Sequence, residues 1–155
     1  FEADHGYDGT FYIQGDSNFL GYGYDIFYSE KKADGTWSEP VNMGTNINSE
    51  HSEMQSWVGI DGFTGNKVIY FTRYDFKTGS ESGIYMSEYL NNEWSVAQKV
   101  SFGGEYVSEG EVSLTRDGKF LYTVHDSGNG EEWILDIYYS TRQTDGSWGA
   151  LKPVD

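Results

Sequence analysis

Residues 25–29 read DIFYS, and close variants of this stretch return as GIYMS at 83–87 and as DIYYS at 136–140. A short turn and a tryptophan follow each copy, and these tryptophans are Trp37, Trp94 and Trp148. Short runs rich in aromatic and β-branched side chains, bounded by turn residues, are typical of β-strands. The chain therefore contains three copies of one unit, which repeats about every 50 residues.

A second hairpin lies upstream of the quoted stretch in every unit. Its turns are Asp8-Gly9, Asp61-Gly62 and Asp117-Gly118. Asp-Gly and Asn-Asn suit the positive φ angles of the type I′ turns that join antiparallel strands. Each unit then has four short strands, and no stretch shows sustained helical periodicity with caps. The sequence predicts an all-β fold.

Four-stranded antiparallel units at this period are typical of the blades of a β-propeller. We expect one propeller unit over 1–155, with three blades at approximately 1–48, 49–106 and 107–155. Propellers usually close with about 4 to 8 blades. Three blades therefore predict either a part of a longer propeller or a homodimer in which two copies complete a six-bladed ring.

The third unit carries a family resemblance, in Asp117-Gly118-Lys119-Phe120-Leu121-Tyr122, in DIYYS at 136–140 and in Asp145-Gly146-Ser147-Trp148. These motifs resemble the WD40-like PD40 repeat of TolB-type propellers and bacterial envelope proteins, and residues 25–48 resemble it equally well. The pattern departs at Arg116, where the family usually has Pro, and at Gly83, which replaces the Asp of the second copy. The resemblance implies an exported bacterial protein, secreted, periplasmic or at the cell surface, that interacts with a protein or an envelope polymer.

Composition limits the classes of function. Ten Lys and Arg face 25 Asp and Glu, which gives a net charge of −15. Such a surface repels a phosphate backbone, so we expect no nucleic-acid partner. The chain has no Cys, which excludes disulfides, Cys-zinc sites and thiol catalysis. No apolar run reaches the roughly 20 residues that a membrane span needs, so we expect no membrane insertion.

Long loops, which gather on one face of such a propeller, contain most of the candidate binding residues. The candidates for a contact surface are five aromatic residues that do not repeat between units and one arginine, namely Trp133, Trp57, Tyr106, Phe76, Tyr22 and Arg73. Aromatic rings there either bind a sugar or a protein partner, or cover the ends of the blades. The repeated tryptophans, in contrast, are expected to pack between blades.

Acidic residues on the same face leave a metal site and a catalytic site open. Glu50, His51 and Glu53 are candidate ligands for a cation such as Ca²⁺, which takes about six to eight oxygen ligands. The alternative is that these carboxylates face water, since no loop has the EF-hand spacing.

The candidates for glycan chemistry are His125, Asp126, Glu109 and Glu111. The neighbours His125 and Asp126 offer a general base with a carboxylate to orient it. Otherwise the imidazole of His125 only caps a loop.

We therefore expect a non-catalytic binding or assembly module that recognises a protein or glycan partner through its acidic, aromatic loop face. The rival function is a glycan-active enzyme, a glycoside hydrolase or polysaccharide lyase, that uses carboxylates and a histidine on that face. A structural ring formed by self-association is a third class. Two carboxylates and a histidine converging in one pocket would favour the enzyme, whereas dispersed carboxylates would favour binding.

Overall fold

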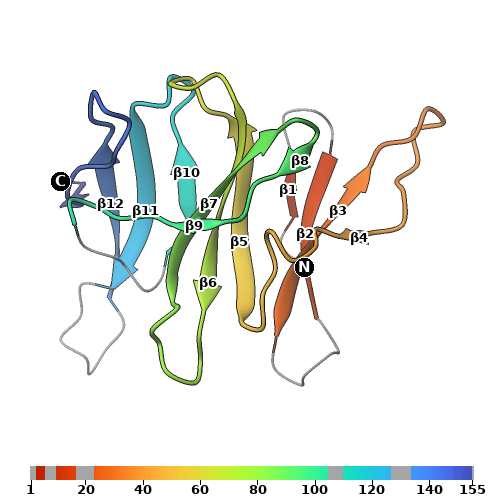
Figure 1. Ribbon diagram of the computed structural model, residues 1–155, viewed down its shortest axis with the longest axis horizontal. Coiled ribbons are helices and arrows are strands. Elements are labelled where there is room, and N and C mark those ends of the chain that lie inside the picture. Colours follow the sequence, from red (N-terminus) through yellow and green to blue (C-terminus); the bar gives the residue numbers. More distant parts are fainter. Residues whose placement is uncertain (1–2, 6–9, 17–22, 105–109, 127–133, 155) are drawn as a thin grey trace.

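The computed structural model describes residues 3–5, 10–16, 23–104, 110–126 and 134–154 (Figure 1). Over these residues the chain forms thirteen strands and no helix, which confirms the all-β prediction. No segment of the described residues is therefore a helix long and apolar enough to cross a membrane.

Three antiparallel sheets divide the strands in chain order, and they lie side by side in Figure 1. The first sheet consists of β1 (Ala3–His5), β2 (Thr10–Asp16), β3 (Tyr24–Glu30) and β4 (Val41–Asn42). The second sheet consists of β5 (Ser52–Ile60), β6 (Lys67–Tyr74), β7 (Gly83–Leu90), β8 (Glu93–Trp94) and β9 (Gln98–Lys99), of which β8 and β9 both pair with β7. The third sheet consists of β10 (Val112–Leu114), β11 (Phe120–Asp126), β12 (Leu135–Thr141) and β13 (Lys152–Pro153).

The central strand pairs of the three sheets share one register, as the repeat predicts. The equivalent cross-strand pairs are Tyr12 with Tyr28, Tyr70 with Met86, and Tyr122 with Tyr139. The repeated serines have one structural role, because each buried hydroxyl donates to a backbone carbonyl oxygen across the outer turn. These bonds run from Ser29 to Ser38, from Ser87 to Ser95 and from Ser140 to Gly149, at 2.7, 2.6 and 2.7 Å.

The core consists of two apolar layers, one on each side of the second sheet. Successive side chains of a strand point to opposite faces, so Val68 and Tyr70 of β6 enter one layer while Ile69 and Phe71 enter the other. The layer between the first and second sheets contains Tyr12, Ile26, Ile47, Val58, Ile69, Phe71 and Tyr85. The layer between the second and third sheets contains Val68, Tyr70, Ile84, Val100, Phe102, Val112, Leu114, Leu121 and Trp148.

The repeated tryptophans differ in their burial. Trp148 is 6% exposed within the layer between the second and third sheets, and Trp94 packs against the layer between the first and second. These two tryptophans pack between neighbouring sheets. Trp37, however, is 39% exposed, because no sheet lies on its side of the first sheet among the described residues.

The turns differ from the predicted type I′ geometry. The predicted turn Asp8-Gly9 lies outside the described residues. Among the predicted turns that the structure describes, both central residues have positive φ only at Asn91-Asn92, whereas at Asp34-Gly35 and Asp145-Gly146 only the glycine does. Each of these aspartates instead accepts a hydrogen bond from the backbone N–H two residues further on. Gly62 has no positive φ and is needed for space, since a Cβ there would lie 2.4 Å from the Arg116 carbonyl oxygen.

These hydrogen bonds lower the pKa of the turn aspartates. The pKa of Asp34 is lowered first by the hydrogen bond from the Thr36 hydroxyl and then by that from the Thr36 N–H, and Ser147 lowers the pKa of Asp145 in the same way. The pKa of Asp117 is lowered by hydrogen bonds from the Thr115 hydroxyl and the Lys119 N–H. A carboxyl whose pKa is lowered in the folded state stabilises the fold above its unfolded pKa, near 3.9, and loses that contribution as pH falls through the folded value.

We expect the melting temperature of a triple Asp34→Asn, Asp117→Asn, Asp145→Asn variant to fall less than that of the parent chain between about pH 5 and pH 3. The asparagine oxygen still accepts the turn hydrogen bond, but it does not titrate. Thermal melts followed by circular dichroism across this range measure the difference. Parallel pH profiles for the two proteins would show that these carboxyls have no part in acid sensitivity.

Candidate functional site

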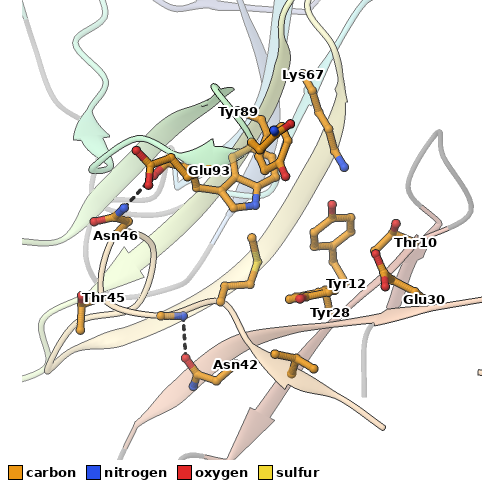
Figure 2. Close-up of a pocket in the computed structure, with 15 residues that line it drawn as sticks. Thr10, Tyr12, Tyr28, Glu30, Asn42, Thr45, Asn46, Lys67, Tyr89 and Glu93 are labelled. Carbon is orange, nitrogen blue, oxygen red and sulfur yellow. Dashed lines mark hydrogen bonds between the residues drawn. The ribbon is translucent and has the colours of Figure 1, made fainter. Parts of the chain in front are cut away.

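An open hollow of about 670 Å³ lies between the first and second sheets (Figure 2). A volume of this size is within the range of small-molecule binding sites. The hollow is lined by Thr10, Tyr12, Tyr28, Glu30, Val41, Asn42, Met43, Gly44, Thr45, Asn46, Lys67, Tyr89, Asn92, Glu93 and Trp94.

Aromatic side chains from both sheets form the walls. Tyr12 and Tyr28 are cross-strand neighbours on β2 and β3, and Tyr89 and Trp94 are neighbours on β7 and β8. The rings of Tyr89 and Trp94 meet edge to face, with centroids 5.1 Å apart. Tyr12 is buried in the core, whereas Tyr89 keeps 37% of its surface exposed. The hollow therefore has one wall anchored in each sheet.

Lys67 joins the two walls. Its Nζ lies 5.7, 5.5 and 5.6 Å from the ring centroids of Tyr12, Tyr89 and Trp94. A cation at these distances is attracted by the negative faces of the rings. Lys67 begins β6 of the second sheet, and Figure 2 shows its side chain directed toward Tyr12 of the first.

The segment that connects the first sheet to the second borders the hollow and is fixed by asparagine side chains. The Asn46 Nδ2 donates to the Trp94 carbonyl oxygen at 2.7 Å, and the Ala97 N–H donates to the Asn46 carbonyl oxygen at 2.8 Å. The Asn42 Oδ1 accepts the Gly44 N–H at 2.8 Å, and the dashed lines of Figure 2 mark this bond and that of the Asn46 side chain. Asn48 pairs with both backbone groups of Ile26 at 2.9 Å. These hydrogen bonds fix the part of the lining that the connecting segment provides.

The described polar groups around the hollow include two carboxylates, of Glu30 and Glu93, and the amide of Asn92. A carboxylate accepts hydrogen bonds, and a side-chain amide both donates and accepts them. The hydroxyl groups of a polyol both donate and accept, so this set matches their chemistry.

The aromatic residues predicted to form a contact surface lie elsewhere. Trp133, Tyr106 and Tyr22 fall outside the described residues. Phe76 is 70% exposed and stacks on Tyr74, with ring centroids 5.7 Å apart. Of the predicted long loops, only Thr45 and Asn46 of the 45–53 segment reach the hollow among its described lining residues.

Trp57 is partly buried, and its predicted contact with a partner stays a prediction. It lies against the layer between the second and third sheets, with its ring centroid 6.4 Å from that of Tyr70. A Cβ at Gly59 would come within 2.6 Å of the indole, so this glycine provides room for the ring. Trp57 occupies a regular position of its strand, because it pairs with Tyr70 as Ser113 pairs with Tyr122 in the third sheet.

Arg73 was predicted as a binding residue and Glu53 as a metal ligand. In the structure the two side chains form an ion pair with each other. The Arg73 Nε lies 2.7 Å from the Glu53 Oε1, and the guanidinium lies 4.1 Å from the centroid of the Tyr85 ring. Arg73 also donates to the Ile47 carbonyl oxygen at 3.0 Å. Glu53 is fully buried and accepts the Ser49 hydroxyl at 2.6 Å. Burial raises the pKa of Glu53, against the lowering effect of the Ser49 and Arg73 hydrogen bonds.

The described residues give the metal prediction no support. Glu53 already has an arginine as its cation, and the His51 Nδ1 lies 3.8 Å from the Asp75 Oδ1, outside direct hydrogen-bond distance. Glu50 is exposed. In the part of the chain that the structure describes, no group of three His, Asp or Glu side chains is placed to hold a metal ion.

The four candidates for glycan chemistry are not assembled by the described residues. Glu109 and the side chain of Asp126 lie outside them. His125 meets the Tyr138 ring edge to face at 5.3 Å. Glu111 lies at a smaller hollow of about 410 Å³, and of its described lining residues only Glu111 carries a carboxylate. The enzyme hypothesis therefore stays a prediction.

A scan against models of known protein families and a search of curated proteins return no match for this chain. The resemblance to the PD40 repeat accordingly stays a prediction based on the quoted motifs. The hollow, including Lys67, Tyr12 and Tyr89, is not predictable from one repeat, because two different repeats contribute its walls. The asparagines at 42, 46 and 48 were the available signal, since the connection at 100–104 has none.

Proposed function

We propose that this chain is a non-catalytic binding module that takes a neutral carbohydrate in the hollow between its first and second sheets. The observation that carries the proposal is the combination of aromatic walls with carboxylate and amide groups around one hollow. We further propose that the three sheets are blades of a propeller and that the module is exported, as the PD40 resemblance implies.

Aromatic walls suit one face of a sugar ring. Sugar rings present C–H groups on their faces and hydroxyl groups around their edge. A tyrosine or tryptophan ring offers a large flat apolar surface with a polar group at one end. Tyr89 and Trp94 are the candidates for stacking, because Tyr89 is exposed and Trp94 is half-buried.

The charges favour a neutral ligand. A net charge of −15, with Glu30 and Glu93 at the hollow, opposes the approach of an anionic ligand. Lys67, held by three rings between the walls, opposes a cationic ligand. A polyhydroxylated molecule without charge avoids both forms of repulsion and still satisfies the polar groups.

The blade proposal is supported by the order of the strands and by the packing. In all three units the first four strands of the sheet pair in chain order. Each adjacent pair of sheets shares one apolar layer, which contains the equivalent residues Tyr12 and Ile26 in one case and Tyr70 and Ile84 in the other. Radially arranged blades pack face to face in this way.

We expect Tyr89→Ala to weaken carbohydrate binding about tenfold or more, which corresponds to about 1.4 kcal/mol. The experiment screens the chain against neutral cello-, malto-, xylo- and manno-oligosaccharides and chitin oligosaccharides, and then titrates the tightest binder by calorimetry. Tyr89 is already partly exposed, so the variant should remain folded.

Phe76→Ala is the matched control, because it also removes an exposed aromatic ring but lies away from the hollow. The proposal requires this variant to bind like the parent chain. If Phe76→Ala abolished binding while Tyr89→Ala did not, the site would lie on the long-loop face. If no sugar in the panel bound, the carbohydrate proposal would be wrong.

A further inference from the structure

The third sheet exposes an apolar face. The equivalent faces of the first and second sheets are each covered by the neighbouring sheet. We call the face of each sheet that carries the repeated tyrosine and isoleucine its forward face. Tyr12 and Ile26 are 3% and 1% exposed on the first sheet, and Tyr70 and Ile84 are both 0% exposed on the second. On the third sheet, Tyr122 and Ile137 are 37% and 57% exposed.

The exposed apolar face is continuous. Tyr122 pairs with Tyr139 and Val124 pairs with Ile137, so these four side chains share one side of β11 and β12. Leu135 continues the row and is 60% exposed. The opposite side of the same strands is buried against the second sheet, where Leu121 and Thr123 are 0% and 2% exposed.

The structure also indicates what covers a forward face. The forward face of the first sheet is covered by the second sheet, and that of the second by the third, each time by the face opposite to the tyrosine. The first sheet has such an opposite face, and no described sheet lies on it. Trp37 belongs to that side by its equivalence to Trp94 and Trp148, and it is 39% exposed.

A buried ion pair joins the second and third sheets, and the equivalents of its two residues lie at the uncovered faces of the third and first sheets. In this pair, Asp61 of one sheet and Arg142 of the next lie 3.0 Å apart. Asp117 is the equivalent of Asp61, since both precede a glycine and accept the N–H two residues on. Lys31 is the equivalent of Arg142, because each forms a β-bridge with the tryptophan of its own repeat. Asp117 and Lys31 are both exposed in the single chain.

We propose that two copies of this chain associate, with the third sheet of each copy docked on the first sheet of the other and Asp117 paired with Lys31 across each contact. The two contacts are equivalent under a two-fold axis, so they close a ring of six sheets and leave no open end. The complementary faces and the opposite charges are both on this chain, which is why the occupant is a second copy. This assembly does not depend on the carbohydrate proposal, because the hollow lies within one copy.

Light scattering coupled to size exclusion on the parent chain is expected to give twice 17.6 kDa. Ile137→Asp should convert this dimer to a monomer with an unchanged circular dichroism spectrum, because Ile137 is exposed in the single chain. Val96→Asp is the matched control, since Val96 is 60% exposed in the connection between β8 and β9, away from the third sheet's open face, and should leave the dimer intact.

A charge exchange tests the pairing without placing a charge in an apolar layer. Lys31→Asp and Asp117→Lys should each raise the dissociation constant about tenfold or more, and the double variant should recover most of the loss. A parent chain that is monomeric at all concentrations, or that forms open-ended polymers, would overturn the proposal. A dimer in which the double variant is no tighter than the single variants would also overturn it.

Discussion

Replacing Asp61 with alanine is expected to lower the free energy of unfolding by about 3–5 kcal/mol, because it leaves a buried cation without its partner. The side chains of Asp61 and Arg142 are 2% and 6% exposed, and the Arg142 Nη1 lies 3.0 Å from the Asp61 Oδ2. The guanidinium also lies 4.9 and 4.7 Å from the centroids of the Phe63 and Trp148 rings. The pair joins the second sheet to the third, so its loss affects the contact between them.

Asp145→Ala is the matched control for this prediction. Asp145 also accepts the N–H two residues on, at 3.0 Å, but it is exposed and has no buried cation beside it in the described structure. Urea denaturation of both variants separates the turn hydrogen bond, which both lose, from the buried charge, which only Asp61→Ala leaves unpaired. Equal losses of stability in the two variants would show that the Asp61–Arg142 pair contributes little.

We expect Glu53→Ala to have a comparable effect, with a loss of about 3–5 kcal/mol. Arg73 has a side chain only 12% exposed, and its Nε depends on the Glu53 Oε1 at 2.7 Å. Removal of the carboxylate also leaves the Ser49 hydroxyl without its acceptor. This site lies between the first and second sheets, away from Asp61.

A double variant, Glu53→Leu with Arg73→Met, separates two contributions to the free energy of unfolding. One is the cost of leaving Arg73 unpaired, and the other is the stabilisation by the ion pair itself. Replacing both partners of a buried ion pair with apolar side chains is often close to neutral. We therefore expect the double variant to recover most of the stability that Glu53→Ala loses, as measured by urea denaturation. A double variant as unstable as Glu53→Ala would mean that the pair itself, and not the uncompensated Arg73, accounts for the loss.

The strand order of the fold was predictable, because it follows from local signals that repeat. The DIFYS-like stretches and the serines at 29, 87 and 140 each have the same role in their own sheet. The turn type was less predictable, because two different turns join similar strands. In one, an aspartate accepts a backbone N–H, and in the other an Asn-Asn pair has two positive φ angles. The repeat alone does not specify this difference.

The site could not be predicted in the same way, because it forms between repeats. Tyr12 and Trp94 are far apart in the sequence, and only the packing of two sheets brings both rings to the Nζ of Lys67. Arg73 and Glu53 illustrate the converse case. Arg73 was predicted to contact a partner and Glu53 to bind a cation, yet they form an ion pair because their positions are cross-strand neighbours on β5 and β6. The residue type alone does not show whether a charged side chain is free or forms an ion pair. The register of the two strands is needed to tell.

The central claim, carbohydrate binding between the first and second sheets, is tested most directly by nuclear magnetic resonance of the tryptophan side chains. The chain has five tryptophans, so its indole N–H groups give five signals, which single Trp→Phe variants assign. Titration with the tightest-binding neutral oligosaccharide of the panel should shift the Trp94 signal and leave that of Trp37, its exposed equivalent in the first sheet, unchanged. A titration in which the Trp133 signal moves and that of Trp94 does not would contradict the account and place binding on the long-loop face.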